Sequence, residues 1–230
     1  MTRLAALAGV FASSLLWVST AGAETITIGL CSGATCSTIT TEASGTNSAS
    51  FSGSTAAFTT INVSGAGPAN PLNLLSDDID IASGVSATNI LHVFVTEQGV
   101  TGPVGAAINF ASSFTSNALS AGWTLTEQTF LDPANGLFTT TGPLSSAPFT
   151  TIGTQSANAI GNTGSPGPYS VTEEYTITTH GFGNTNDTID LSATAATPIP
   201  GALPLFAAGI GMMGLLARRR KRNNSALAAA

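Results

Sequence analysis

Acidic and amide side chains gather in two short stretches of this sequence that could bind a metal ion together. They are Asp77, Asp78 and Asp80 in the first stretch and Asn186, Asp187 and Asp190 in the second. Calcium takes several oxygen ligands from carboxylates and amides, although neither stretch has the spacing of an EF-hand loop. Asp and Asn also gather in turns for local hydrogen-bonding reasons. The sequence therefore predicts no cofactor, and the alternative is a calcium ion bound by these residues.

Residues that could carry out catalysis are few. The only histidines are His92 and His180, and the sequence has neither a G-x-S-x-G nor an H-E-x-x-H motif. The adjacent carboxylates Glu173 and Glu174 would point to opposite faces of a strand, so they could not act as an acid and base pair. We expect His92 to be a hydrogen-bonded structural residue and His180 to lie exposed in a turn. The sequence predicts a protein that is not an enzyme.

Aromatic side chains that could stack on a sugar ring are also rare. Trp123, Tyr169 and Tyr175 are the candidates outside the phenylalanines. We take Trp123 as the candidate carbohydrate-stacking residue, and the alternative is that each of these rings belongs to the core.

A four-residue pattern of an apolar residue, Thr, Glu and a polar residue occurs three times. Its glutamates are Glu97, Glu127 and Glu173, and the unequal separations do not support a solenoid repeat. We expect three strands that show these glutamates to solvent. The alternative is a row of carboxylates on one face that attracts cations.

Charge is distributed very unevenly along the chain. Residues 24–197 hold all twelve Asp and Glu residues and none of the six Lys and Arg residues. Because affinity for a phosphate backbone comes chiefly from Lys and Arg, the sequence excludes nucleic acid as a partner of this region.

Alternation of apolar and polar residues predicts that residues 24–197 form a single all-β domain. Period two is clear in 25–30, 78–81 and 188–193, and residues 89–95 are apolar on both faces, as in a central strand. Further expected strands are 51–63, 108–114, 123–130, 137–141, 149–152 and 169–179. Turn residues separate these segments, so we expect a jelly-roll-like β-sandwich of about ten strands. Residues 112–121 could supply one short helix.

The N-terminus has the features of a secretory signal peptide. Arg3 precedes an apolar run from Leu4 to Val18, and Ala21-Gly22-Ala23 resembles a peptidase site. The run is shorter than the ~20 residues that a membrane-spanning helix needs. We therefore expect residues 1–23 to be removed after export. In an exported chain with only two cysteines, Cys31 and Cys36 should form a disulfide across a tight hairpin.

The C-terminus predicts a membrane-spanning helix. Residues 199–217 contain no charge, and a basic cluster follows them at once: Arg218, Arg219, Arg220, Lys221 and Arg222. Such an apolar length is close to that of a bilayer span. By the positive-inside rule the cluster and the tail 223–230 should stay cytoplasmic.

This C-terminal order of features resembles the PEP-CTERM protein-sorting signal of Gram-negative bacteria that make exopolysaccharide. The motif here is Pro198, Ile199, Pro200, Gly201 and Ala202, followed by Leu-Pro-Leu-Phe. It lacks the typical Glu but is similar to the Val-Pro-Leu-Pro-Ala variant, and the resemblance covers about residues 197–222. It implies export by Sec and signal peptidase, transient anchoring in the inner membrane, and processing by an exosortase. The destination that it implies is the cell surface or the extracellular matrix.

The sequence thus indicates where the protein is sent more clearly than what residues 24–197, which we call the body, would bind. We expect a non-enzymatic structural or adhesive component associated with exopolysaccharide. The alternative is a carbohydrate- or calcium-binding β-sandwich module.

Overall fold

The structure is a computed structural model that describes residues 24–67, 71–164 and 167–196, together with the helical residues Phe206, Ala208, Ile210, Met212 and Met213. The expected signal peptide (1–23), the sorting motif (198–202), the basic cluster (218–222) and the tail (223–230) lie outside the described residues. No helix among the described residues is both long and apolar enough to cross a bilayer.

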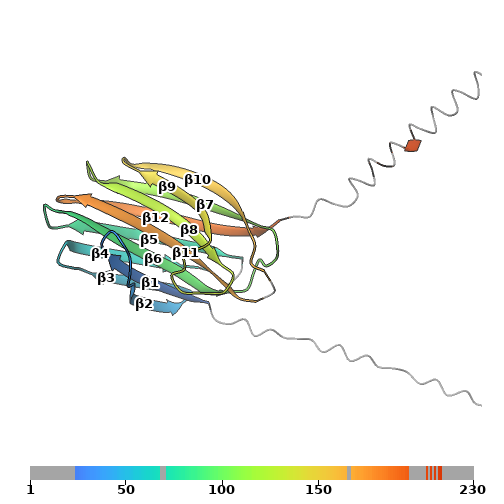
Figure 1. The fold of residues 1–230 in the computed structure, drawn as a ribbon, viewed down its shortest axis with the longest axis horizontal. Coiled ribbons are helices and arrows are strands. Elements are labelled where there is room, and N and C mark those ends of the chain that lie inside the picture. Colours follow the sequence, from blue (N-terminus) through green and yellow to red (C-terminus); the bar gives the residue numbers. More distant parts are fainter. Residues whose placement is uncertain are drawn as a thin grey trace, which may run out of the picture.

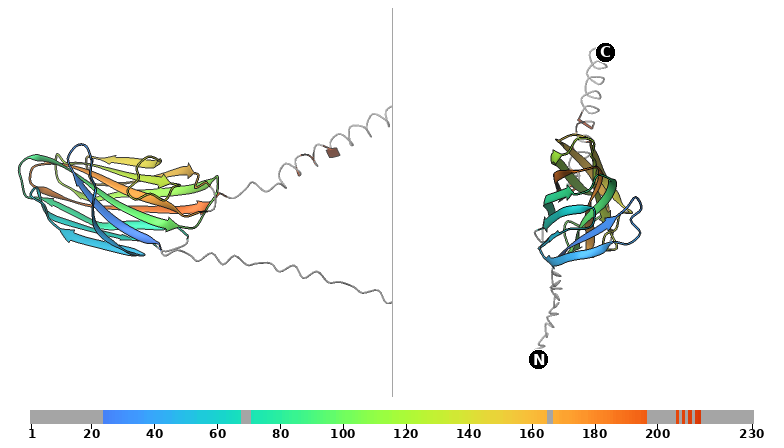
Figure 2. Two further views of the ribbon diagram at one scale, coloured as in Figure 1. Left: turned by 60° about the horizontal axis from the view of Figure 1, so that its bottom comes forward. Right: turned by 90° about the vertical axis from the view of Figure 1, so that its left-hand side faces the viewer.

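Two six-stranded antiparallel sheets pack face to face, which confirms the prediction of an all-β sandwich (Figure 1). In spatial order, the first sheet contains β2 (Thr40–Thr46), β1 (Thr25–Ser32), β6 (Thr88–Val100), β11 (Tyr169–His180), β8 (Thr124–Asp132) and β9 (Pro143–Phe149). The second sheet contains β10 (Gly153–Gly161), β7 (Ile108–Leu119), β12 (Gly183–Ala195), β5 (Asn73–Ser83), β4 (Phe58–Ala66) and β3 (Ser48–Gly53). The strands run roughly along the long axis of the sandwich (Figure 2).

The connections between strands cross repeatedly from one sheet to the other. In the last eight strands, the order β10-β7-β12-β5 in the second sheet faces β9-β8-β11-β6 in the first. Such an arrangement is consistent with the jelly-roll type of sandwich. The remaining strands, β1 to β4, extend both sheets on the side of β5 and β6.

Apolar side chains from both sheets fill the space between them. On the first sheet the inward residues include Ile28 of β1 and Val93 of β6, and on the second they include Ile81 of β5 and Leu191 of β12; all four are at most 1% exposed. These residues follow the period-two pattern of the sequence, because alternate side chains of a strand point to one face. As predicted, β6 is a central strand that pairs with β1 on one side and β11 on the other.

Several expected elements differ from the structure. The structure has twelve strands where ten were expected. The strand expected over 51–63 is divided into β3 and β4, β2 and β10 were not expected, and the strand expected over 137–141 does not form. Residues 137–141 form a loop, and 150–152 form the turn between β9 and β10. The short helix considered for 112–121 is wrong, since residues up to Leu119 belong to β7.

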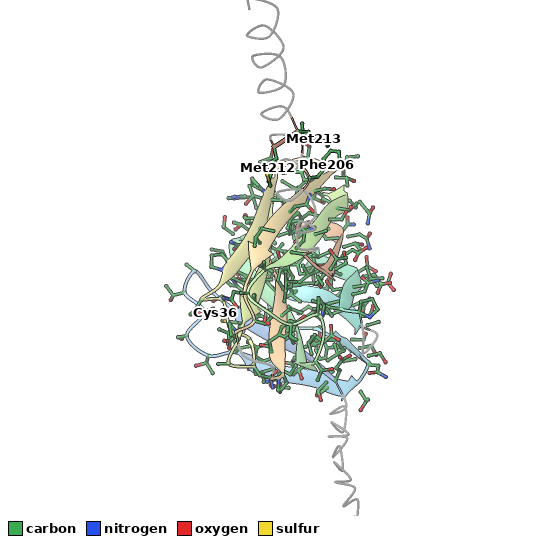
Figure 3. The ribbon with its side chains drawn as sticks, turned by 90° about the vertical axis from the view of Figure 1, so that its right-hand side faces the viewer. Cys36, Phe206, Met212 and Met213 are labelled. Carbon is green, nitrogen blue, oxygen red and sulfur yellow. A yellow bond between two sulfur atoms is a disulfide. The ribbon has the colours of Figure 1, made fainter. Side chains whose placement is uncertain are left out.

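The loop at 137–141 covers the outer face of the first sheet. The ring of Phe138 lies 5.9 Å from that of Phe94, centroid to centroid. Gly29 makes room for it, since a Cβ at this position would lie 2.5 Å from the Phe138 ring. Cys31 and Cys36 form a disulfide in another loop on this side, with Cα atoms 5.7 Å apart. Figure 3 shows Cys36 at the margin of the molecule, outside the two sheets.

Candidate functional site

The two acidic stretches lie on neighbouring strands of the second sheet. Asn186 of β12 is directly opposite Asp80 of β5, and its Nδ2 atom donates a hydrogen bond of 2.5 Å to Asp80 Oδ1. The pairing of β5 shifts by one residue between Ser76 and Ile79, where Asp77 and Asp78 form a bulge. Asp78 adopts a left-handed conformation there, with φ of 52°. The bulge therefore adds a second acidic residue to the outer face of the sheet.

A shallow groove of about 450 Å³ crosses this outer face over β3, β4 and β5. Its lining residues are Ser50, Phe51, Ser52, Asn62, Val63, Ser64, Asp78 and Asp80. The polar members are already held in place, because Ser52 donates a hydrogen bond of 2.7 Å to Asn62 and Ser64 donates to Asp77. Hydroxyl, amide and carboxylate groups fixed on a rigid sheet are suited to hydrogen bonding with sugar hydroxyls.

The structure does not bring the six residues expected to bind calcium into one site. Asp187 points into the core and is 0% exposed, whereas Asn186 and Asp190 lie on the opposite face of β12. Thr185 donates a hydrogen bond of 2.6 Å to Asp187 Oδ2. Within the described ranges, no three acidic, histidine or cysteine side chains are grouped closely enough to hold a metal ion. Asp187 therefore does not share a site with the other residues expected to bind calcium.

Trp123 is also placed differently from the prediction. It lies just before β8, is 1% exposed and belongs to the hydrophobic core. A sugar cannot reach a buried ring, so Trp123 is not a stacking platform in this structure. Tyr169 and Tyr175 are both 0% exposed, which excludes them for the same reason.

The glutamates of the repeated pattern face the core rather than solvent. Glu97, Glu127 and Glu173 lie on three neighbouring strands of the first sheet, β6, β8 and β11, and all three are 0% exposed. Asp187 reaches the same interior from the second sheet. We call these four residues the core carboxyl cluster. The expectation that the glutamates contact solvent is wrong.

Uncharged polar groups contact part of the core carboxyl cluster. Ser76 of β5 donates a hydrogen bond to Glu173 Oε2, and the Tyr175 hydroxyl lies 2.6 Å from Ser76 Oγ. Glu97 lies beside the Glu24 carboxyl and Glu127 beside the backbone of Thr115, and among the described residues no hydroxyl or amide side chain forms a hydrogen bond with either glutamate. Residues 24–197 contain no Lys or Arg, so no such side chain of the body can neutralise these groups.

Burial raises the pKa of every carboxyl group in the core carboxyl cluster. Burial, together with the nearby Glu24 carboxyl, raises the pKa of Glu97 to about 8. Burial and the charge of Asp187 raise the pKa of Glu127 to about 9. The pKa of Asp187 rises to about 7, and that of Glu173 rises well above its ordinary value, in both cases chiefly through burial. These carboxyls are consequently held in the protonated form over much of the neutral range.

Both histidines lie within hydrogen-bond distance of side chains on neighbouring strands. His92 lies on the outer face of the first sheet, where its Nδ1 atom is 2.9 Å from Glu174 Oε1 and 3.2 Å from Thr176 Oγ1. This hydrogen-bonded position agrees with the prediction for His92. His180 is exposed at the end of β11, and its Nδ1 atom lies 3.2 Å from Thr88 Oγ1.

Comparisons with known proteins do not assign a function to this chain. No protein-family model matches the chain, and no curated protein matches it in sequence. Among solved structures, it is similar to TmCBM61, described in complex with beta-1,4-galactotriose, with a TM-score of 0.30 and 8% sequence identity. That match covers 54% of this chain and 71% of the other.

Proposed function

We propose that this chain is an exported cell-surface or extracellular-matrix protein, and that its β-sandwich is a non-enzymatic structural or adhesive component associated with exopolysaccharide. The observation that carries the proposal is the order of three features at the C-terminus, namely the Pro-rich motif 198–202, an apolar segment and the cluster 218–222. An exosortase-type enzyme would process this segment after export by Sec and signal peptidase. The membrane is a partner during sorting, and nucleic acid is not a partner of the body.

The charge distribution supports this order of events. The body carries all twelve acidic residues and no basic residue, while five of the six basic residues follow the apolar segment. Positive charge that follows an apolar segment keeps the end of the chain in the cytoplasm. The body itself contains no Lys or Arg, so the basic residues of the C-terminus are confined to the segment that this proposal has removed.

The first test is the localisation and mass of the mature protein in the producing cells. We expect the wild-type protein to reach the surface or matrix without its C-terminal segment. Replacing all five residues 218–222 by Gln should leave the protein mislocalised with the segment attached, because the topological signal is lost. A control in which the four arginines of this cluster are replaced by Lys keeps the charge and should be sorted normally. A full-length C-terminus on mature wild-type protein would contradict the proposal and indicate an anchored ectodomain.

The groove on the second sheet favours a second candidate function, a carbohydrate-binding module that uses its outer face. Asp78 and Asp80 are the carboxylates in this groove, and the bulge of β5 adds Asp78 to the face on which Asp80 lies. Carboxylates accept strong hydrogen bonds from sugar hydroxyls.

Retention on exopolysaccharide from the producing cells tests this second candidate. The double change Asp78→Ala and Asp80→Ala should reduce retention by roughly tenfold, since hydrogen bonds to charged groups are the stronger ones. Glu42→Ala is the matched control, because Glu42 is exposed on β2, in the other sheet. Measuring retention with calcium and with a chelator separates direct sugar binding from binding through calcium. Equal retention of all variants would contradict the use of this groove.

A further inference from the structure

Strand β10 leaves one of its two edges unpaired. It pairs with β7 over all nine residues from Gly153 to Gly161, without a shift in register. No strand of the described ranges pairs with its other side, since β10 is the last strand of the second sheet. Figure 1 shows β9 and β10 along one side of the sandwich, opposite β2 and β3. Every second residue of such an edge directs its N–H and C=O groups outward.

The other three edge strands carry features that oppose pairing with another molecule, whereas β10 does not. Strand β9 contains Pro143 and Pro148, β2 contains Glu42, and β3 has only six residues. Prolines, charges and short length are the usual protections of sheet edges. Strand β10 reads Gly-Thr-Gln-Ser-Ala-Asn-Ala-Ile-Gly and contains neither a charge nor a proline.

Exposed apolar side chains lie at the two ends of this edge. Ile152, in the turn before β10, is 65% exposed, and Ile160 is 68% exposed. Between them, Ser156 and Asn158 share the outer face of the sheet with Ile160, because they alternate with the half-buried Ala157. The free edge therefore offers unpaired main-chain groups flanked by apolar residues.

The charge of the body limits where two copies can meet. All charges in residues 24–197 except histidine are negative, so most surfaces of two copies repel each other. Asp190 of β12 is the acidic residue nearest to this edge in the sheet register. It lies opposite Ser113 of β7, and Ser113 lies opposite Ser156 of β10, so two strand spacings separate Asp190 from β10. If two β10 strands paired, five strand spacings of ~4.8 Å would separate the two copies of Asp190, roughly 24 Å in all. This separation exceeds the Debye length of about 8 Å at physiological salt.

We propose that β10 pairs antiparallel with β10 of a second copy of this chain, about a two-fold axis at Ala157. Ala157 is the middle residue of the strand, so all nine residues are paired, with Gly153 opposite Gly161 and Ser156 opposite Asn158. An axis perpendicular to the sheet keeps inward residues inward in both copies, as the period of two requires. The second sheets of the two molecules then form one continuous sheet. The prolines of β9 keep the first sheets separate.

This interface goes beyond the proposed function, because it depends on the described sheet alone. Sorting to the cell surface can fail its test while the pairing holds, and the pairing can fail while sorting holds.

Sedimentation equilibrium of the full-length chain in a mild detergent tests the proposal. We expect wild-type protein to form dimers, and the double change Ser156→Asp and Asn158→Asp to raise the dimer Kd by roughly tenfold, because like charges then lie directly opposite each other. The matched control is Thr40→Asp and Thr41→Asp on β2, which adds the same charge to an exposed edge strand of the first sheet. This control should dimerise like wild type. Dimers that are weakened equally by both changes, or by neither, would overturn the proposal, as would a wild-type protein that stays monomeric. Association through the C-terminal segment would leave all three proteins equally dimeric.

Disulfide cross-linking then tests the register. Ser156→Cys chains mixed with Asn158→Cys chains should form linked dimers on oxidation, since directly opposite residues have Cβ atoms about 4.5–5.5 Å apart. Thr154→Cys chains mixed with Asn158→Cys chains are the control and should not be linked, because the pairing places these positions two residues out of register. Efficient linking of the control pair instead would overturn the axis at Ala157.

Discussion

Raising the pH from about 5 to about 9 should steeply lower the free energy of unfolding of this protein. The cause is the core carboxyl cluster, whose members have pKa values in the folded state above their ordinary values, at about 8 for Glu97, about 9 for Glu127 and about 7 for Asp187. Between the unfolded and folded pKa values, the folded state binds more protons than the unfolded state. Stability is therefore fully present below about pH 4 and is lost as the pH rises through the folded pKa values.

The size of this effect is large compared with the stability of a domain. Each such group lowers the free energy of unfolding by about 1.4 kcal/mol per pH unit in its window. Typical domains are stable by about 5–15 kcal/mol, so several groups acting together can remove most of that margin. Melting temperature and urea midpoint, measured from acid to alkaline pH, should both fall. A profile that is flat or rises across this range would show that the cluster is ionised or solvated in the folded protein.

The substitution Glu127→Gln isolates one member of the cluster. Gln keeps the shape of the side chain but does not titrate, so the variant should gain about 4 kcal/mol relative to wild type on going from about pH 4.5 to about pH 8. Glu42→Gln is the control, because Glu42 lies exposed on β2 and its replacement should change stability little at either pH. An equal effect of both substitutions at the two pH values would contradict a buried, protonated Glu127.

The burial of these glutamates could have been predicted from the sequence. Val95 and Glu97 are two residues apart on one strand, so an inward Val95 requires an inward Glu97. The same relation joins Leu125 to Glu127, and Val171 to Glu173. The expectation of exposed glutamates relied on the usual preference of charge for solvent, and here the period of the strand is stronger than that preference. Asp187 follows the same rule, because it is two residues from the buried Ile189.

Strands were predictable where apolar alternation was strong and not where packing alone defines them. Strands β1, β5 and β12 alternate clearly, and their apolar residues form much of the core. Strand β7 places the small polar residues Ser112 and Ser116 inward beside Phe114, which weakens its pattern and makes a helix plausible from sequence. Strand β10 is an edge that buries little, so its sequence is under no strong apolar constraint.

The outer groove was only partly predictable, because its geometry depends on a bulge. Asp80 and Asn186 were both expected near an oxygen-rich site, and the register of β5 and β12 brings them together. The one-residue shift at Asp77 and Asp78 moves these side chains relative to the alternation of the strand. The sequence contains no Gly or Pro there that would indicate a bulge.

Replacing Trp123 by Ala should destabilise the protein by about 3–5 kcal/mol, because a large buried ring is removed from the core. Trp123 is 1% exposed, and a Cβ at Gly183 would lie 3.1 Å from its ring, which shows how closely the chain packs there. Its Nε1 atom has no hydrogen-bond partner among the described residues, so Trp123→Phe should cost much less, under about 2 kcal/mol.

Phe182 supplies the matched control for Trp123. Phe182 is the aromatic residue directly before Gly183 in the sequence and is 71% exposed. Phe182→Ala should therefore change the free energy of unfolding by less than about 0.5 kcal/mol. Urea denaturation at about pH 5, where the core carboxyl cluster is protonated, compares the three variants without the pH-linked loss of stability. A Trp123→Ala protein that unfolds like wild type but is released from exopolysaccharide would contradict the buried position and restore Trp123 as a surface platform. Loss of stability with Trp123→Ala and not with Phe182→Ala would instead mean that the ring acts through the core, so that any weaker retention of that variant follows from unfolding.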